Sequence, residues 1–137
     1  MIPRAVIDTN VFVSAFWTDN PASPPMLIYR ALLSRKFIPV YSEEIMREYT
    51  EVLHRDKFGF PSDRVDEVIS LLHELGREIV PAEPGTETFP DPDDRVFYCT
   101  ALAAQDDGAV LVTGNKRHFP SAGFILTPAE FVASHLT

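Results

Sequence analysis

An acidic residue interrupts an apolar stretch near the start of this sequence. The chain opens MIPRAVIDTNVFVSAFW, in which the apolar residues 5–7 are followed at once by Asp8, Thr9 and Asn10, and apolar residues then resume. A carboxylate between two segments of buried character either caps the following helix or binds a ligand. On this stretch alone, both interpretations of Asp8 stay open.

A second acid borders the apolar side of a predicted helix in the segment YSEEIMREYTEVLH. The apolar residues recur at helical spacing: Ile45, Met46, Tyr49, Val52 and Leu53. Glu48 falls about 100° from the centre of this stripe at roughly 100° per residue, so its side chain can reach into a cleft. Glu43 and Glu44 are explained by the helix dipole. The alternative for Glu48 is a solvated border position.

Aspartates also open a predicted helix in the segment DPDDRVFYCTALAAQDDG. Asp91 suits an N-cap and Pro92 suits the first helical position, so both have a structural explanation. Asp94 instead shares a helical stripe with Phe97 and Ala101. We expect an acid in line with a buried face, at the positive end of the helix dipole, to stay ionised and to face a ligand such as a metal ion.

Polar residues follow a predicted strand in the segment AVLVTGNKRHF. Thr113 and Asn115 offer oxygen donors directly after the strand, and Gly114 permits a close approach of the backbone. Lys116 and Arg117 form a basic pair that could contact phosphate. A polar turn with a solvated basic pair is the alternative interpretation.

The elements that must position these residues alternate along the chain. Strands are expected at residues 4–7, 37–41, 78–80, 109–112 and 124–126. Helices are expected from residue 11 and at residues 26–35, 43–54, 63–75, 91–105 and 128–135. The helix at 63–75 is expected to be capped by Ser62 and ended by Gly76. This pattern predicts a three-layer α/β fold with a central, mostly parallel twisted sheet and helices on both faces. Ligands of such sheets bind at the carboxyl ends of the strands, where Asp8 and Asn115 are expected.

The composition narrows the classes of function. The length of 137 residues predicts a single domain spanning residues 1–137. The net charge of −8 argues against a broad basic nucleic-acid surface, although metal ions could bridge an acidic site to phosphate. The single cysteine excludes an internal disulfide framework and a cysteine-rich zinc site. No apolar stretch is long enough to span a membrane, so we expect a soluble, cytoplasmic protein.

The acidic residues are expected to gather in one cleft. Asp8, Glu48 and Asp94 would repel one another there, and their burial as ions would be costly. Hard cations that prefer oxygen ligands relieve both effects, so the pattern favours Mg²⁺ or Mn²⁺.

The same stretches resemble those of PIN-domain ribonucleases, the fold of VapC-type toxins in toxin–antitoxin modules. The matching segments are VIDTNVFVSA, SEEIMREYTEVL and DPDDRVFYCTALAAQDDGAVLVTGNKRHF, in the order of the family and with connections that span nearly the whole chain. By this resemblance Asp8, Glu48 and Asp94 occupy the family's acidic positions. Asn115 stands where many members have Asp and others Asn, and Thr9, Asn10 and Thr113 match the motif residues beside the acids.

The resemblance implies a metal-dependent endoribonuclease that hydrolyses single-stranded RNA, as the toxin of a toxin–antitoxin module. The implied catalytic residues are Asp8, Glu48, Asp94 and Asn115. Among them, Asp8 and Asp94 would hold Mg²⁺ or Mn²⁺ directly, and Glu48 would complete the metal site. The residues implied to lie along the substrate are Thr9, Asn10, Thr113, Lys116 and Arg117. A cognate antitoxin protein and a second copy of the chain are the candidate protein partners.

One departure from the family keeps an alternative open. Some members carry an acid where this chain has His118, so only three acidic positions are matched, with Asp91 and Asp93 as possible substitutes. A catalytically inactive PIN-fold module that binds RNA or a protein is therefore the alternative function. A haloacid-dehalogenase-like phosphatase needs a second aspartate where Asn10 stands. A receiver domain needs an acidic pair at the end of the first strand and a phospho-acceptor aspartate in the middle of the chain, and the segments VIDTN and FIPVYS supply neither.

Overall fold

The computed structural model describes residues 2–137, and these residues form an α/β fold. The strands are β1 (Arg4–Ile7), β2 (Ile38–Tyr41), β3 (Arg77–Glu78), β4 (Val110–Val112) and β5 (Ile125–Leu126). The helices are α1 (Thr9–Trp17), α2 (Pro24–Leu33), α3 (Glu43–Leu53), α4 (Ser62–Leu75), α5 (Arg95–Ala103) and α6 (Pro128–His135). Strand and helix alternate along the chain as the sequence predicts.

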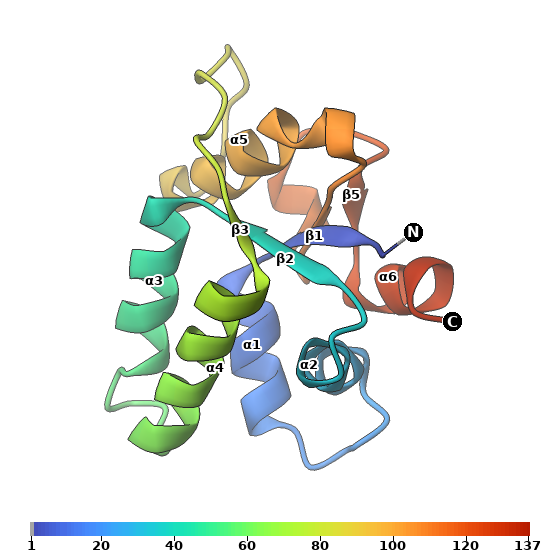
Figure 1. Ribbon diagram of the computed structural model, residues 1–137. Helices are drawn as coiled ribbons and strands as arrows, with labels where there is room; N and C mark the ends of the chain where they lie inside the picture. The colour runs from blue at the N-terminus through green and yellow to red at the C-terminus, as the bar shows by residue number, and fades with distance from the viewer. Residues whose placement is uncertain (1) are drawn as a thin grey trace.

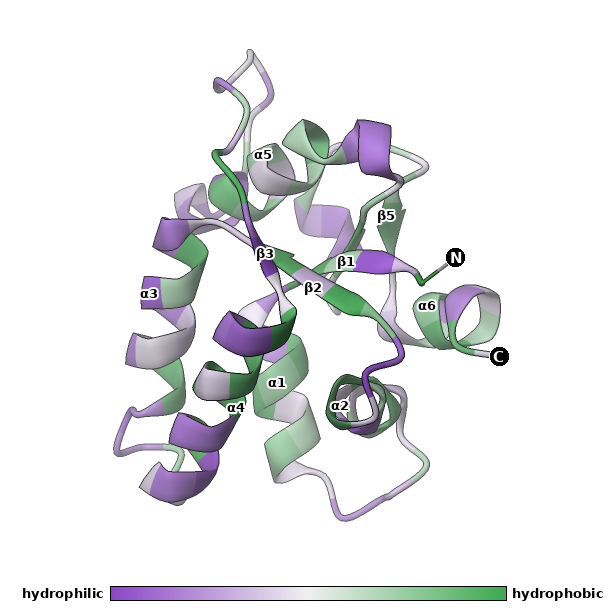
Figure 2. Cartoon of the chain, in the orientation of Figure 1, coloured by the Kyte–Doolittle hydropathy of each residue, from purple (hydrophilic) through white to green (hydrophobic). Residues whose placement is uncertain are grey.

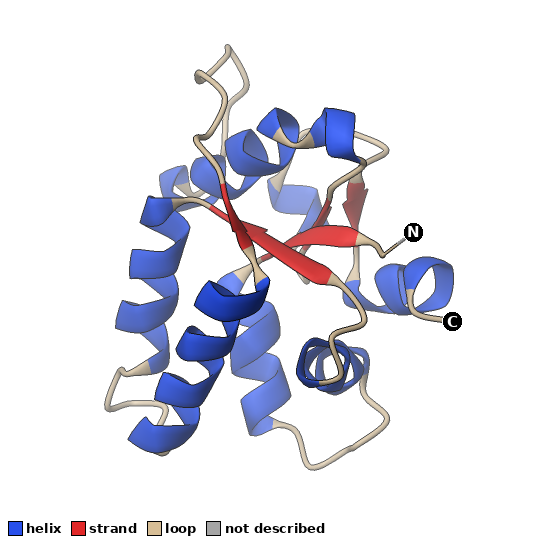
Figure 3. Ribbon diagram, in the orientation of Figure 1, coloured by secondary structure: helices blue, strands red, loops and turns tan. Residues whose placement is uncertain are grey.

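The strands form one parallel sheet in the order β3-β2-β1-β4-β5, with helices on both faces. Helix α5 packs against β1, β2 and β4 on one face, and α1, α2, α4 and α6 lie across the other (Figure 1). Helix α3 stands beside the edge at which β1 and β2 end. Figure 3 shows the strands enclosed between the helical layers. The prediction of a three-layer α/β fold is confirmed.

The hydropathy of the strands follows their position in the sheet. The central strands β1 and β4 are almost completely buried, because helices cover them on both faces. Strand β3 lies at one edge and consists of the exposed residues Arg77 and Glu78, so it is coloured as hydrophilic in Figure 2. Charged residues on an edge strand discourage pairing with another chain. The sheet therefore presents its apolar strands only to its own helices.

The ends of α4 differ in part from the prediction. The helix begins at Ser62 itself, and Pro61 occupies the N-cap position without a side-chain hydrogen bond, so the prediction of Ser62 as the cap is wrong. Gly76 ends the helix as predicted. A Cβ atom there would lie 2.6 Å from Cε1 of Tyr41 and 2.8 Å from the carbonyl oxygen of Pro39, so the helix end approaches β2 too closely for a side chain.

The predicted helix over residues 91–105 is divided in the structure. A 3₁₀ turn over Pro92–Asp94 precedes α5, and a second over Gln105–Asp107 follows it. Asp91 caps the first turn by accepting a hydrogen bond from the backbone N–H of Asp93, as its type predicts. Asp94 consequently stands at the junction of the two helical segments. Across residues 2–137, no helix combines the length and the apolar character that crossing a membrane requires.

Candidate active site

The carboxyl edge of the sheet brings Asp8 and Thr113 together although 105 residues separate them. Strands β1 and β4 are neighbours, and the backbone N–H of Asp8 extends their ladder by donating to the carbonyl of Val112 at 2.9 Å. Immediately beyond, the hydroxyl of Thr113 donates to Oδ2 of Asp8 at 2.7 Å. The prediction that the polar residues after these strands share one edge is confirmed.

Asp8 acts as a helix cap and is also buried. It is the N-cap of α1, and its Oδ1 accepts a hydrogen bond from the backbone N–H of Asn10 at 3.3 Å. It is also only 4 % exposed. Burial raises the pKa of its carboxyl, and the hydrogen bonds from Thr113 and Asn10 act against that rise.

Glu48 reaches the same edge from α3. The hydroxyl of Thr9, the first residue of α1, donates a hydrogen bond to its Oε2. Burial raises the pKa of the Glu48 carboxyl, and the nearby charge of Asp8 raises it further. The structure therefore resolves the open choice at this position: Glu48 faces a partly buried, acidic site and is not a solvated border residue.

Tyr49 ties the segments that carry the acids, a role that the sequence did not reveal. Its side chain is fully buried, and its hydroxyl donates to the carbonyl of Ile7, the residue before Asp8. Its ring packs edge-on against Phe12 of α1, with 5.3 Å between centroids, and lies 6.4 Å from the ring of Phe97 on α5. One side chain thus contacts β1, α1 and α5 from α3.

Asp94 faces the acids from the start of α5. It occupies the N-cap position, but its side chain makes no capping hydrogen bond. Its side chain is 16 % exposed, and Oδ2 lies 3.9 Å from Nδ1 of His118. Burial, and then the charges of Asp8, Asp91, Glu48 and Asp93, raise the pKa of Asp94 to about 7. At Asp94, burial and neighbouring carboxylates therefore outweigh the favourable effect of the helix dipole on its pKa.

The acids lack the partners that usually neutralise buried carboxylates. Within residues 2–137, no lysine or arginine forms a salt bridge with Asp8, Glu48 or Asp94. Over the same residues, no group of three or more His, Cys, Asp or Glu side chains is arranged so that it could hold a metal ion. Asp8 and Glu48 instead accept hydrogen bonds from the hydroxyl groups of Thr113 and Thr9. The donors are carboxylate oxygens without a lysine or arginine partner, which is the type of ligand that Mg²⁺ and Mn²⁺ prefer.

The residues after β4 divide between the site and the neighbouring helix. The backbone N–H of Asn115 donates to the hydroxyl of Thr113 at 3.0 Å, which places Asn115 directly after the site threonine. The Lys116 ammonium binds Oε1 of Glu130 on α6 at 3.1 Å, so it is directed toward that helix. Arg117 is exposed. His118, noted in the sequence only as a departure from the family pattern, contacts Asp94.

Comparison with known proteins accounts for this arrangement. Residues 4–117 match the sequence family described as the PIN domain. The chain belongs to the PIN domain family. No curated protein and no solved structure gives a significant match. PIN domains are generally nucleases, so the acid-lined edge of the sheet is the candidate active site.

Proposed function

We propose that this PIN domain is a Mg²⁺- or Mn²⁺-dependent endoribonuclease that hydrolyses phosphodiester bonds in single-stranded RNA. One observation carries the proposal: Asp8, Glu48 and Asp94 come from three distant segments, and Asp8 and Glu48 raise the pKa of Asp94 while Asp8 raises that of Glu48. Within residues 2–137, no lysine or arginine forms a salt bridge with any of the three. A divalent cation would supply the missing positive charge.

The donor set assigns a role to each residue. Asp8 and Asp94 would hold the cation directly. Asp94 makes no capping hydrogen bond, and each oxygen of Asp8 accepts only one hydrogen bond, which leaves it a lone pair for a cation. Glu48 and Asn115 would act through ordered water. When bound, the cation would lower the pKa of a water molecule and neutralise charge on the scissile phosphate.

The residues around the acids fix their orientation. The hydroxyl groups of Thr113 and Thr9 each donate to one carboxylate, which leaves Asp8 and Glu48 oriented in the absence of a cation. Asn10 supplies the backbone N–H to Asp8. Arg117 is the exposed cation available for a phosphate of the RNA next to the cleaved bond, whereas Lys116 is already paired with Glu130.

Cleavage of a fluorescent single-stranded RNA tests the proposal. The wild-type protein should cleave it with Mn²⁺ or Mg²⁺, and Asp8→Ala should abolish cleavage while the circular dichroism spectrum is retained. Full activity in EDTA would show that the acids do not act through a metal ion.

The biological setting follows from the family resemblance. We infer that the chain is the toxin of a toxin–antitoxin module, with a cognate antitoxin protein and a second copy of the chain as candidate partners. Expression of the wild-type protein alone should arrest growth of a bacterial host, and Asp8→Ala should not.

A non-catalytic PIN-fold module that binds RNA or a protein is the second candidate. His118 favours it, because an imidazole contacts Asp94 where some PIN domains carry another acid. Cation-independent RNA binding without cleavage, in protein that folds normally, would support this alternative over the ribonuclease.

A further inference from the structure

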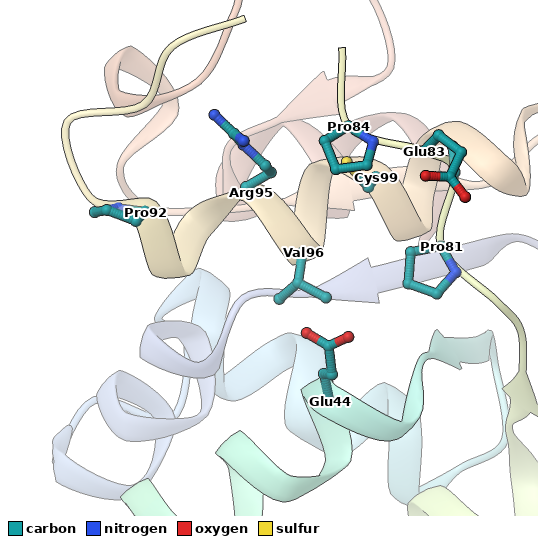
Figure 4. Close-up of a pocket in the computed structure, with 9 residues that line it drawn as sticks. Glu44, Pro81, Glu83, Pro84, Pro92, Arg95, Val96 and Cys99 are labelled. Atoms are coloured by element: carbon teal, nitrogen blue, oxygen red, sulfur yellow. The ribbon is translucent and has the colours of Figure 1, made fainter. Parts of the chain in front are cut away.

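A pocket of about 340 Å³ lies beside the acids, between α5, the first turn of α3 and the segment 81–84. Its lining residues are Glu44, Pro81, Ala82, Glu83, Pro84, Pro92, Arg95, Val96 and Cys99. Figure 4 shows the Glu44 carboxylate directed toward Val96, with Pro81 and Pro84 along the opposite side. Polar and apolar surface contribute about equally to the walls, and the charged lining residues are Glu44, Glu83 and Arg95.

The walls of the pocket are held in place by contacts of their own. The backbone N–H of Ala82 donates to the carbonyl of Cys99 at 3.0 Å, which ties the segment 81–84 to α5. The Arg95 guanidinium donates to the carbonyl of Glu87 at 3.1 Å and lies 5.4 Å from the centroid of the Phe89 ring. The pocket is therefore formed without a ligand, as small-molecule sites usually are.

The pocket is lined by residues that neighbour two of the acids in the chain, although none of the three acids lines it. Pro92 and Arg95 flank Asp94 in the chain. On α3, Glu44 lies four residues before Glu48, which is about 6 Å along the helix axis. A group held in the pocket would thus be displaced from the acids by a short step along the same two helices that carry Glu48 and Asp94.

We propose that this pocket binds one nucleobase of the RNA strand whose backbone lies over the acids. The proposal rests on the ribonuclease function above. The apolar part of the walls, formed by proline, alanine, valine and cysteine side chains, can contact the face of a base, and the volume is within the range of sites for small ligands. The carboxylates of Glu44 and Glu83 disfavour a phosphate group there and accept hydrogen bonds from a base.

The two carboxylates also set a preference among bases. A carboxylate is an acceptor only, so it pairs with an exocyclic amino group, as glutamate does with N4 of cytosine. Adenine, cytosine and guanine carry such a group. Uracil offers only its N3–H group, which lies between two carbonyl oxygens that repel a carboxylate. The site should therefore take any of the three amino-bearing bases in preference to uracil.

Nuclear magnetic resonance tests binding without cleavage. The ¹⁵N-labelled wild-type protein, in EDTA, is titrated separately with AMP, CMP, GMP and UMP. The amide signals of Ala82, Val96 and Cys99 should shift with the three amino-bearing nucleotides and shift least with UMP. Absence of shifts at these residues with all four nucleotides, or equal shifts with UMP, would overturn the proposal.

Two variants test the pocket in the RNA reaction. Ala82→Phe should fill the pocket, remove the nucleotide shifts and lower kcat/KM for RNA about tenfold, while Mn²⁺ affinity is unchanged. Glu44→Gln adds no volume and should lower the preference for amino-bearing bases over uracil about threefold. Ala133→Phe places the same ring on an exposed position of α6 and should change neither quantity.

The failures of the two proposals are distinguishable. If the protein cleaves RNA but Ala82→Phe retains full kcat/KM and base preference, the pocket proposal is wrong and the ribonuclease stands. If no cleavage occurs but the nucleotide shifts appear and Ala82→Phe removes them, the pocket binds bases in a non-catalytic module. If Ala82→Phe does not fold, the base preference of Glu44→Gln and the nucleotide titration of the wild-type protein still test the pocket proposal.

Discussion

The surroundings of carboxylates in two regions of this PIN domain shift their pKa values in opposite directions. Glu130, near the start of α6, accepts from the backbone N–H of Thr127, forms a capping box with that residue and binds Lys116. These contacts lower the pKa of Glu130. At the carboxyl edge of the sheet, burial and neighbouring acids instead raise the pKa of Asp8, Glu48 and Asp94.

We infer from this difference that Glu130 has a structural role and that the acids at the sheet edge are the ones available to a metal ion. Glu130 is satisfied by the protein itself, so its charge requires nothing further. The acids at the sheet edge remain costly to ionise in the absence of a cation, and such arrangements are enriched at functional sites. The comparison predicts that substitutions in the two groups have opposite consequences for activity and stability.

The largest difference is expected in catalysis. Asp8→Asn should lower RNA cleavage by more than about 100-fold, because loss even of groups that only orient metal ligands costs about 10–100-fold. Glu130→Gln, the same change of carboxylate to amide, should change cleavage less than about twofold. Single-turnover cleavage rates measure both; equal losses in the two variants would remove the distinction between the groups.

Tyr49 provides the next test, because it supports the acids without being one of them. Tyr49→Phe leaves the buried carbonyl of Ile7 without its hydroxyl donor and should destabilise the protein by about 1–3 kcal/mol. It should also weaken Mn²⁺ binding about tenfold, the lower end of the cost of losing an orienting partner. Urea unfolding and calorimetric titration measure the two effects.

Tyr41→Phe is the matched control for this prediction. Tyr41 is also buried, but its ring packs on His73 and on the close approach of Gly76, away from the acids. This variant should retain the Mn²⁺ affinity of the wild type. If Tyr49→Phe also binds Mn²⁺ normally, then Tyr49 stabilises the fold without positioning the site.

The raised pKa values predict how stability depends on pH. Between about pH 4 and pH 7, the unfolded chain ionises Asp94 from its ordinary value of 3.8, whereas the folded chain keeps the proton up to about 7. The folded state then binds more protons, so the free energy of unfolding in EDTA should fall as the pH rises through this window. Asp94→Asn should flatten this part of the pH profile.

A divalent cation should reverse this loss. Mn²⁺ binds the ionised acids, so it should raise Tm at pH 8 by several degrees and have little effect at pH 5. Glu130→Gln should leave the response to the cation unchanged. An equal rise in Tm at both pH values would indicate that the cation binds elsewhere.

The sequence predicted most of the fold because its signals are local and strong. Buried strands such as β4 are short apolar runs, and α6 opens with proline and a glutamate in its first turn. The parallel topology then places Asp8 and Thr113 at one edge without further information. The start of α4 was missed because the choice between Pro61 and Ser62 as the cap depends on local backbone geometry.

The details of the site were harder to predict because they depend on side chains from distant segments. Tyr49 reads as one more residue in an apolar stripe, and nothing near it in the sequence indicates that its hydroxyl reaches Ile7. The pKa of Asp94 likewise depends on Asp8 and Glu48, which only the folded chain brings near. Lys116 and Arg117 are adjacent and similar in the sequence. Only the folded chain shows that Lys116 pairs with Glu130, whereas Arg117 is exposed.

The different surroundings of Lys116 and Arg117 give the smallest predicted effect on RNA cleavage. Arg117→Ala should lower kcat/KM for RNA several-fold and make cleavage less sensitive to salt, because one phosphate contact is lost. Lys116→Ala should leave kcat/KM nearly unchanged, because its ammonium is bound to Glu130. The reverse order of the two losses would place Lys116, and not Arg117, beside the RNA.

The most direct test of the central claim is a crystal of the protein soaked in MnCl₂ and measured for anomalous scattering. We predict one strong manganese peak bounded by the carboxylates of Asp8 and Asp94, with Glu48 within reach through water, and no such peak in Asp8→Asn. A peak bound only by other residues, or the same peak in Asp8→Asn, would contradict the claim that these distant acids share a metal ion.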